Sequence, residues 1–256
     1  MRSFVPPAGT PYHRLTHHIS RRRSLLTALA VLVATQIVPL TFILTMERVA
    51  PDGLPVLGHY TELVLSFAAI ACILPVTLLI IRCGEGRRIG TLSSVTGRLR
   101  WPWLALCLAI AATCIVLAAC LGSLTAVIVG IEAAPAQEQP STWTGPGPYL
   151  TILTILLVLI VAQVAAEEYV ARGVILQAIG RLTHSPWPAI SVQAVIFTAL
   201  HGTNGGPWGT LAVLTIGIAL GWLTTRTGGL EAALALRFPR LAGGLVTWRR
   251  WAQAER

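Results

Sequence analysis

Long apolar runs dominate this chain and restrict it to one kind of environment. Hydrophobic residues make up 54% of the sequence and charged residues only 11%, and the mean hydropathy is +0.71. A helix that rises 1.5 Å per residue needs about 20 residues to cross roughly 30 Å of hydrocarbon. Because a backbone in lipid must satisfy its own hydrogen bonds, such runs predict spanning helices. The predicted fold class is therefore all-α, a polytopic transmembrane helical bundle.

Six runs are predicted to span the membrane, and a seventh apolar segment stops after about two turns. The runs cover approximately residues 25–46, 63–81, 103–131, 149–179, 189–201 and 208–226, and the short segment covers 230–236. Pro75 predicts a kink in the second span, and neighbouring helices can accommodate Pro39 in the first. The third run is long enough to tilt strongly or to break near Gly122.

Arginines cluster in alternate connections between the runs. They lie in the N-terminal region, in the 82–100 loop, at Arg181 and at Arg226, whereas the 132–148 loop has no basic residue. Cytoplasmic loops carry this excess, so the chain is expected in the cell membrane with its N-terminus in the cytoplasm. The expected divisions are a cytoplasmic tail (1–24), N-terminal helices and loops (25–148), a core (149–236) and an atypical Arg- and Trp-rich tail (237–256).

A net charge of +9 and a pI near 10.4 would favour nucleic acid as the partner of a soluble protein. Here the arginines lie at the ends of apolar runs, where anionic lipid headgroups attract them. No basic segment interleaved with aromatic residues is long enough to fold separately. The expected partners are therefore the lipid bilayer and a membrane-embedded peptide or protein, and not nucleic acid.

Two adjacent carboxylates, Glu167 and Glu168, interrupt the fourth run. At the centre of a spanning helix each costs on the order of 2.5 to 3.5 kcal/mol, so a stabilising partner is expected. Arg172 is four residues after Glu168 and shares its helix face, which predicts an internal ion pair. Glu167 points about 100° away and can address another helix. The alternative is a solvated charge cluster in the headgroup zone, although the sequence after Arg172 stays mostly apolar.

His201 is the histidine that ends an apolar run, whereas the others lie in loops. A histidine in this place is often a helix cap or an interfacial residue. An imidazole and a carboxylate at similar depth on neighbouring helices can instead bind and deprotonate a water molecule. Glu167 and His201 can also offer two ligands to zinc, although such sites normally need three.

These residues resemble the first two motifs of a known family of membrane proteases. Glu167-Glu168-x-x-x-Arg172 followed by Phe197-x-x-x-His201 is similar to the CAAX-prenyl-protease and bacteriocin-processing family, also called CPBP or Abi. The flanking segments 92–101 and 221–230 resemble it as well. The resemblance covers about residues 92–236.

The resemblance implies a helical bundle around a membrane-embedded cavity. Glu167 and His201 would orient or activate the water that attacks a peptide bond, and Glu168 and Arg172 would support them. A divalent metal, usually taken to be zinc, has been proposed for relatives, and Glu167 and His201 would be its ligands here. Eukaryotic members cleave prenylated C-terminal tripeptides, and bacterial members are linked with peptide processing and bacteriocin self-immunity.

The third motif of the family, His-x-x-x-Asn, is missing. Arg237 stands at its histidine position and Leu241 at its asparagine position, and Pro239 is expected to break any helix there. One hypothesis is a shift of the reading frame near Leu236, which resequencing the locus would test. The alternative is a genuine tail that lies on the headgroups through Trp248 and other tryptophans and arginines.

The sequence therefore predicts an intramembrane CPBP-type endopeptidase whose activity is weakened or lost with the third motif. Loss of one group that stabilises an oxyanion typically costs about 10² to 10³ in rate. One alternative is a catalytically inactive pseudoprotease that binds a membrane peptide or partner protein and confers immunity. The other is a proton-coupled transporter, which the lack of an inverted repeat disfavours.

Overall fold

The computed structural model describes residues 7, 9–55, 57–130, 146–202 and 206–239. Most of the predicted 132–148 loop, the centre of the predicted 202–206 turn, Leu241 and the 240–256 tail lie outside these residues. Among the residues described, five helices are long and apolar enough to cross a membrane. Regular structure in this part is helical, apart from one isolated antiparallel bridge between Ser94 and Gly229. The prediction of a polytopic helical bundle is confirmed.

The first two spans form one side of the bundle. Helix α1 (Arg21–Val49) starts at an N-cap, Ser20, and continues through Pro39 without interruption. The second span consists of α2 (Thr61–Ala71) and α3 (Ile73–Gly84), which are separated at Cys72. The proline ring clashes with the carbonyl group four residues earlier, which here belongs to Ala71. The kink predicted from Pro75 therefore lies where that clash places it.

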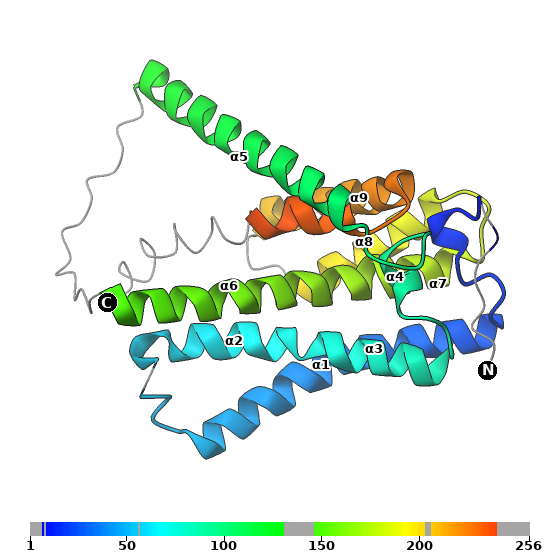
Figure 1. Ribbon diagram of the computed structural model, residues 1–256, viewed down its shortest axis with the longest axis horizontal. Coiled ribbons are helices and arrows are strands. Elements are labelled where there is room, and N and C mark those ends of the chain that lie inside the picture. The colour runs from blue at the N-terminus through cyan, green and yellow to red at the C-terminus, as the bar shows by residue number, and fades with distance from the viewer. Residues whose placement is uncertain (1–6, 8, 56, 131–145, 203–205, 240–256) are drawn as a thin grey trace.

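Helix α5 (Trp101–Val129) is the third span, and it is one unbroken helix through Gly122. It diverges from the other helices toward its C-terminal end (Figure 1). Ala111 is its buried residue, and large apolar side chains along the rest of the helix are exposed. This is the surface expected of a helix in contact with lipid.

The fourth span runs over Leu150–Gly180 and lies between the α1–α3 side of the bundle and the α8–α9 pair (Figure 1). It begins as α6 (Pro146–Glu168), passes into the π-helix η3 (Tyr169–Ile175) and ends as α7 (Leu176–Gly180). The span agrees with the predicted 149–179, but the sequence pattern did not predict the π-helical segment. Long π-helical segments are rare and frequently lie at functional sites.

Helices α8 (Trp187–His201) and α9 (Gly206–Thr227) pack closely side by side. Gly217 and Gly221 are four residues apart on α9, and a Cβ atom at either position would press against α8. Small residues at this spacing let two membrane helices approach. With 15 residues, α8 is shorter than the other predicted spans and is not one of the five long helices.

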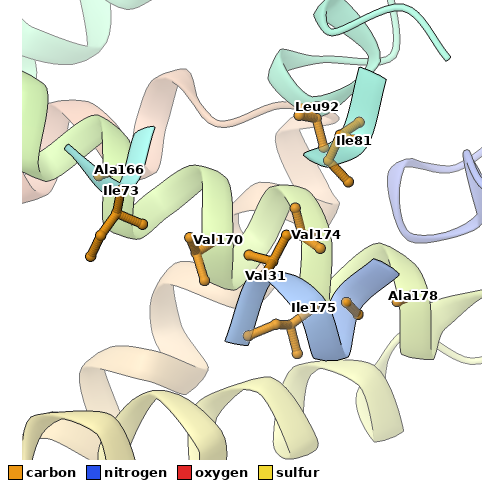
Figure 2. Close-up of a cluster of buried hydrophobic side chains, with 10 residues drawn as sticks. Val31, Ile73, Ile81, Leu92, Ala166, Val170, Val174, Ile175 and Ala178 are labelled. Atoms are coloured by element: carbon orange, nitrogen blue, oxygen red, sulfur yellow. The ribbon is translucent and has the colours of Figure 1, made fainter. Parts of the chain in front are cut away.

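The main hydrophobic core surrounds the fourth span (Figure 2). Its buried members come from α1, α3, the short helix α4 (Gly90–Ser93), α6, η3 and α7. They are Ala28, Val31, Ile73, Ile81, Leu92, Ala166, Val170, Val174, Ile175 and Ala178. Because Ala166 and Val170 flank the glutamate pair, this core fixes the backbone that carries both carboxylates.

Part of the expected N-terminal tail packs against the bundle. The 3-10 helix η1 (Tyr12–Arg14) precedes α1, and the side chains of Tyr12 and Leu15 are buried. The Tyr12 hydroxyl donates a hydrogen bond to the Leu92 carbonyl oxygen. Nothing in the apolar pattern before Arg21 indicated this contact, which joins the N-terminal segment to the 84–100 loop.

Candidate active site

The glutamate pair lies near the middle of the fourth span, where α6 passes into η3. At 1.5 Å per residue, Glu167 is about 25 Å from the start of that span at Leu150 and about 20 Å from its end at Gly180. Both carboxylates are therefore at membrane depth, where each needs a charged or hydrogen-bonding partner.

Glu168 forms the ion pair that the sequence predicts. Its Oε1 lies 2.9 Å from Nη1 of Arg172, and both side chains are 0% exposed. The Arg172 guanidinium stands over the Phe197 ring, with 4.6 Å between the guanidinium carbon and the ring centroid. Its Nη2 donates to the Gly217 carbonyl oxygen at 3.4 Å. Complete burial excludes the solvated headgroup cluster for these two residues.

Glu167 addresses a different helix, as its position predicts. Its Oε2 is 3.3 Å from Nε2 of His201 at the end of α8, and the two side chains are 14% and 34% exposed. On the same helix, Gln163 donates from Nε2 to Oε1 of Glu167 at 3.2 Å. A carboxylate and an imidazole from separate helices thus meet in a partly open position.

The hydrogen bonds of His201 define which ring nitrogen faces the carboxylate. Its Nδ1 lies 2.8 Å from the Phe197 carbonyl oxygen, which can only accept, so Nδ1 carries a proton. In the neutral ring Nε2 then has the free lone pair, and it is the atom directed at Glu167. The ring also packs against Phe197 with 4.1 Å between centroids. Nε2 can therefore accept, hold and return a proton beside Oε2 of Glu167.

Arg237, which the sequence places at the histidine position of the third motif, also reaches the site. Residues 231–239 are helical, so the helix continues past Leu236 as far as Pro239, where the described residues end. Nη2 of Arg237 contacts Oε2 of Glu167, and Nη1 lies 3.2 Å from Oε1 of Glu168. The sequence contained one signal for this contact. Glu167 and Glu168 carry two negative charges, and Arg172 supplies only one positive charge, so a second cation is needed.

A cavity of about 200 Å³ opens beside the Glu167–His201 pair. Helices α1, α2, α3 and α8 line it together with the centre of the fourth span. Its lining residues are Thr35, Gln36, Pro39, Ile70, Ile73, Ala166, Glu167, Val170, Leu200 and His201. The walls are mainly apolar, and the two reactive side chains supply the ionisable groups. This cavity can hold a water molecule and an apolar peptide segment next to the pair.

The donor set beside the cavity does not meet the requirements of a zinc site. Within the described parts of the chain, no group of three or more His, Cys, Asp or Glu side chains is arranged to hold a metal ion. Glu167 and His201 offer two ligands, whereas catalytic zinc sites usually have three protein ligands. The Arg237 guanidinium also contacts the carboxylate that would bind the metal. The residues present therefore do not fit a zinc ion, and the zinc predicted from the sequence is untested.

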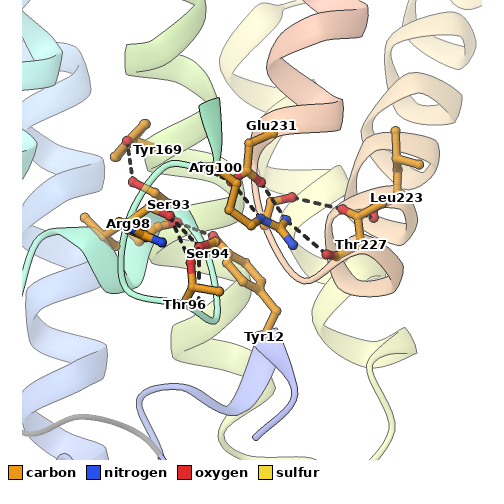
Figure 3. A network of polar contacts seen from close by, with 12 residues as sticks. Tyr12, Ser93, Ser94, Thr96, Arg98, Arg100, Tyr169, Leu223, Thr227 and Glu231 are labelled. Atoms are coloured by element: carbon orange, nitrogen blue, oxygen red, sulfur yellow. Dashed lines mark hydrogen bonds and ion pairs between the residues drawn. The ribbon is translucent and has the colours of Figure 1, made fainter. Parts of the chain in front are cut away.

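An arginine–carboxylate clamp holds the helix that carries Arg237 (Figure 3). Glu231 is buried, and its two oxygens accept from the Arg100 side chain at 3.0 Å and 2.8 Å. The Arg100 backbone N–H also donates to Glu231, at 2.9 Å. The side-chain contact raises the pKa of Arg100, chiefly through its hydrogen bond to Glu231. The two flanking segments named in the resemblance, 92–101 and 221–230, meet at this clamp through Ser94 and Gly229.

Two comparisons with known proteins gave a match. Residues 149–238 match the family described as "Type II CAAX prenyl endopeptidase Rce1-like". The "Uncharacterized protein YyaK" of Bacillus subtilis (strain 168) is 34% identical over 91 residues, which are 34% of this chain and 30% of that protein. No solved structure matches the chain significantly.

The family resemblance inferred from the motifs is thus confirmed over residues 149–238, and the chain is a multi-pass membrane protein with a CAAX-protease-like core. The match includes Glu167, Glu168, Arg172, His201 and Arg237. Because this chain spans less than a third of the length of the curated relative that it matches, that protein's activity is not carried over.

Proposed function

We propose that this chain is an intramembrane endopeptidase of the CAAX-protease type that cleaves peptide bonds in membrane-associated substrates. The observation that carries the proposal is the contact between Glu167 and His201, at 3.3 Å, beside an apolar cavity at membrane depth. The match of residues 149–238 to the family of prenyl endopeptidases supports the same activity.

The proposed reaction begins with a water molecule in the cavity, beside the Glu167–His201 pair and within hydrogen-bond reach of both side chains. Glu167 takes a proton from this water as its oxygen attacks the carbonyl carbon of the scissile bond and forms the new C–O bond. His201 is held in one tautomer by the Phe197 carbonyl, so Nε2 exchanges protons with the reacting groups. When the C–N bond breaks, the proton passes to the amine that leaves. The ion pair with Arg172 holds the side chain of Glu168, which precedes the π-helix η3.

The cavity also limits the substrate class that we propose. Its apolar walls, with Pro39, Ile70 and Ile73 from α1, α2 and α3, suit an extended apolar segment that enters from the membrane. Arg237 shares Oε2 of Glu167 with His201, so an incoming water must compete with a guanidinium for that oxygen. We therefore expect slow turnover in the wild-type chain.

The Arg237 contacts specifically favour one second candidate, a pseudoprotease that binds a membrane peptide without cleaving it. A guanidinium on both carboxylates leaves the cavity open while it occupies the group that must activate water. A binding or immunity function needs the cavity and not the proton transfer. Cleavage and binding must therefore be measured on the same preparation.

The direct test uses the purified full chain in liposomes together with a pool of membrane-anchored reporter peptides, with products read by mass spectrometry. Glu167→Gln and His201→Ala should each lower the cleavage rate by at least about 10²-fold, because each removes a proton-transfer group. Glu62→Gln and His184→Ala are matched controls at exposed positions and should cleave as the wild type does. Cleavage that both active-site variants retain would refute the endopeptidase. Peptide binding without cleavage in the wild type would establish the pseudoprotease.

We also propose a cell-membrane location with the N-terminus in the cytoplasm. The N-terminal segment, the 84–100 loop and Arg181 meet at one end of the bundle, where Arg181 donates to the carbonyls of His17 and Ile19. Basic residues thus collect at one end, which the positive-inside rule assigns to the cytoplasm. A reporter that is active only in the cytoplasm, fused before residue 1, should be active, and an inactive fusion would reverse the orientation.

A further inference from the structure

With His201 neutral, the charges around Glu167 balance only when Arg237 is counted. Glu167 and Glu168 carry two negative charges, and Arg172 and Arg237 carry two positive ones. All four side chains lie in the bundle, with Glu168 and Arg172 0% exposed and Arg237 12% exposed. Without Arg237, one negative charge would remain at membrane depth, where an uncompensated charge is costly. The cluster would then need another cation.

The Arg237 guanidinium occupies the place that such a cation would require. Its Nη2 contacts Oε2 of Glu167, the same oxygen that faces Nε2 of His201. A zinc ion bound to that oxygen and that nitrogen would lie about 2 Å from each. It would therefore stand within a few ångströms of a fixed positive charge, which opposes its binding.

The guanidinium is held in this place from several directions. Its carbon stands 4.9 Å from the Phe197 ring centroid, and its Nη1 is 3.2 Å from Glu168. The Arg100–Glu231 clamp holds the start of the helix that carries it. The contact with Glu167 is therefore part of the packed structure and not the chance position of a flexible side chain.

We propose that Arg237 is the built-in cation of this site and excludes a divalent metal from Glu167 and His201. Changing it to histidine would remove the fixed charge and add a third nitrogen or oxygen donor, which completes the minimum set for zinc. The inference rests on the proposed Glu167–His201 site. The experiment measures bound zinc and not peptide cleavage. The metal exclusion and the endopeptidase activity can therefore fail independently of each other.

The experiment measures the zinc bound by the purified full chain in detergent, by mass spectrometry of the metal after equilibration and by calorimetry. Each protein is compared with its own Glu167→Gln partner, because the subtraction removes zinc bound by cysteines and exposed histidines. Wild type and Glu167→Gln should bind equal amounts. Arg237→His should bind one equivalent more than Arg237→His/Glu167→Gln, and at least tenfold more tightly than the wild type. Arg237→Lys, which keeps the charge, should gain none.

Two results would overturn the inference. One is a wild-type chain that binds an equivalent of zinc that Glu167→Gln loses, which would show that Arg237 does not exclude the metal. The other is a folded Arg237→His protein that gains no zinc. If that variant does not yield folded protein, as judged by size-exclusion chromatography, Arg237→Gln replaces it, since it also removes the charge and leaves Glu168 available as a donor. The wild-type comparison requires neither variant, and zinc that Glu167→Gln loses would by itself refute the exclusion.

Discussion

The helix formed by residues 231–239 makes an arginine–carboxylate contact near each end, and the two contacts differ in how well they are satisfied. At its start, both oxygens of Glu231 accept hydrogen bonds from Arg100. Toward its other end, Arg237 joins the acid cluster, which contains Glu167, Glu168 and Arg172. There, Oε2 of Glu168 and Nε of Arg172 are buried and have no hydrogen-bond partner among the residues that the structure describes.

This difference separates a structural contact from a candidate site. A buried ion pair stabilises a fold only when its remaining polar atoms also find partners, as they do around Glu231. Buried polar atoms without partners are uncommon and are often found where catalysis or ligand binding requires them. We infer that the clamp holds the 231–239 helix in place. The acid cluster keeps charged groups within the bundle because the proposed proton transfer at Glu167 needs them.

The largest expected effect tests the acid cluster. Arg172→Ala removes the fully buried partner of Glu168 and should lower the free energy of unfolding by about 3–5 kcal/mol. The exposed Arg82 provides the control, since Arg82→Ala should change it by less than about 0.5 kcal/mol. Reversible unfolding in mixed micelles measures both. If Arg172→Ala costs as little as the control, Arg172 is not the cation that compensates the buried charge of Glu168.

A smaller effect on the free energy of unfolding is expected when a methyl group is added beside the clamp. A Cβ atom at Gly229 would meet the Glu231 carboxylate, the Arg100 guanidinium and, at 2.8 Å, the Ser94 Cβ. Gly229→Ala should therefore lower the free energy of unfolding by about 1–3 kcal/mol, because the clamp must shift. Gly122→Ala in α5 is the matched control, since its new Cβ meets no atom within 4 Å. Equal stability of the two variants would show that the clamp is loosely packed.

The smallest effect should come from altering the clamp while keeping its charge. Arg100→Lys cannot reproduce the bidentate contact with Glu231, but the lysine still provides a positive charge beside that carboxylate. We expect a loss of about 1 kcal/mol in the free energy of unfolding, measured as for the other variants. A loss larger than that of Arg172→Ala would reverse the comparison between the two contacts.

The parts of the fold that the sequence predicts depend on local patterns. Apolar runs identify spans because length and hydropathy determine insertion, and the clash caused by Pro75 places the break at Cys72. The Glu168–Arg172 pair follows from helical spacing, and Glu167 reaches His201 because it points to another face. The catalytic roles of these residues stay predictions until cleavage is measured.

The parts that the sequence does not predict are non-local. Arg237 meets Glu167 across 70 positions, and the sequence placed it at the third-motif position without giving the contacts of its side chain with both carboxylates. Proline removes one hydrogen bond and does not require a helix to end, as Pro39 inside α1 shows. The sequence pattern does not distinguish the π-helix after Glu168 from an α-helix, because both would continue the same span with mostly apolar residues.

The most direct test of the central claim measures cleavage and unfolding on the same Glu167→Gln protein in liposomes. Our account predicts that the reporter peptides are no longer cleaved, while the protein stays folded and loses less free energy of unfolding than Arg172→Ala does, because Glu167 and Arg237 are partly exposed whereas Glu168 and Arg172 are fully buried. Cleavage by Glu167→Gln at the wild-type rate would contradict this account. A loss of unfolding free energy as large as that of Arg172→Ala would also contradict it.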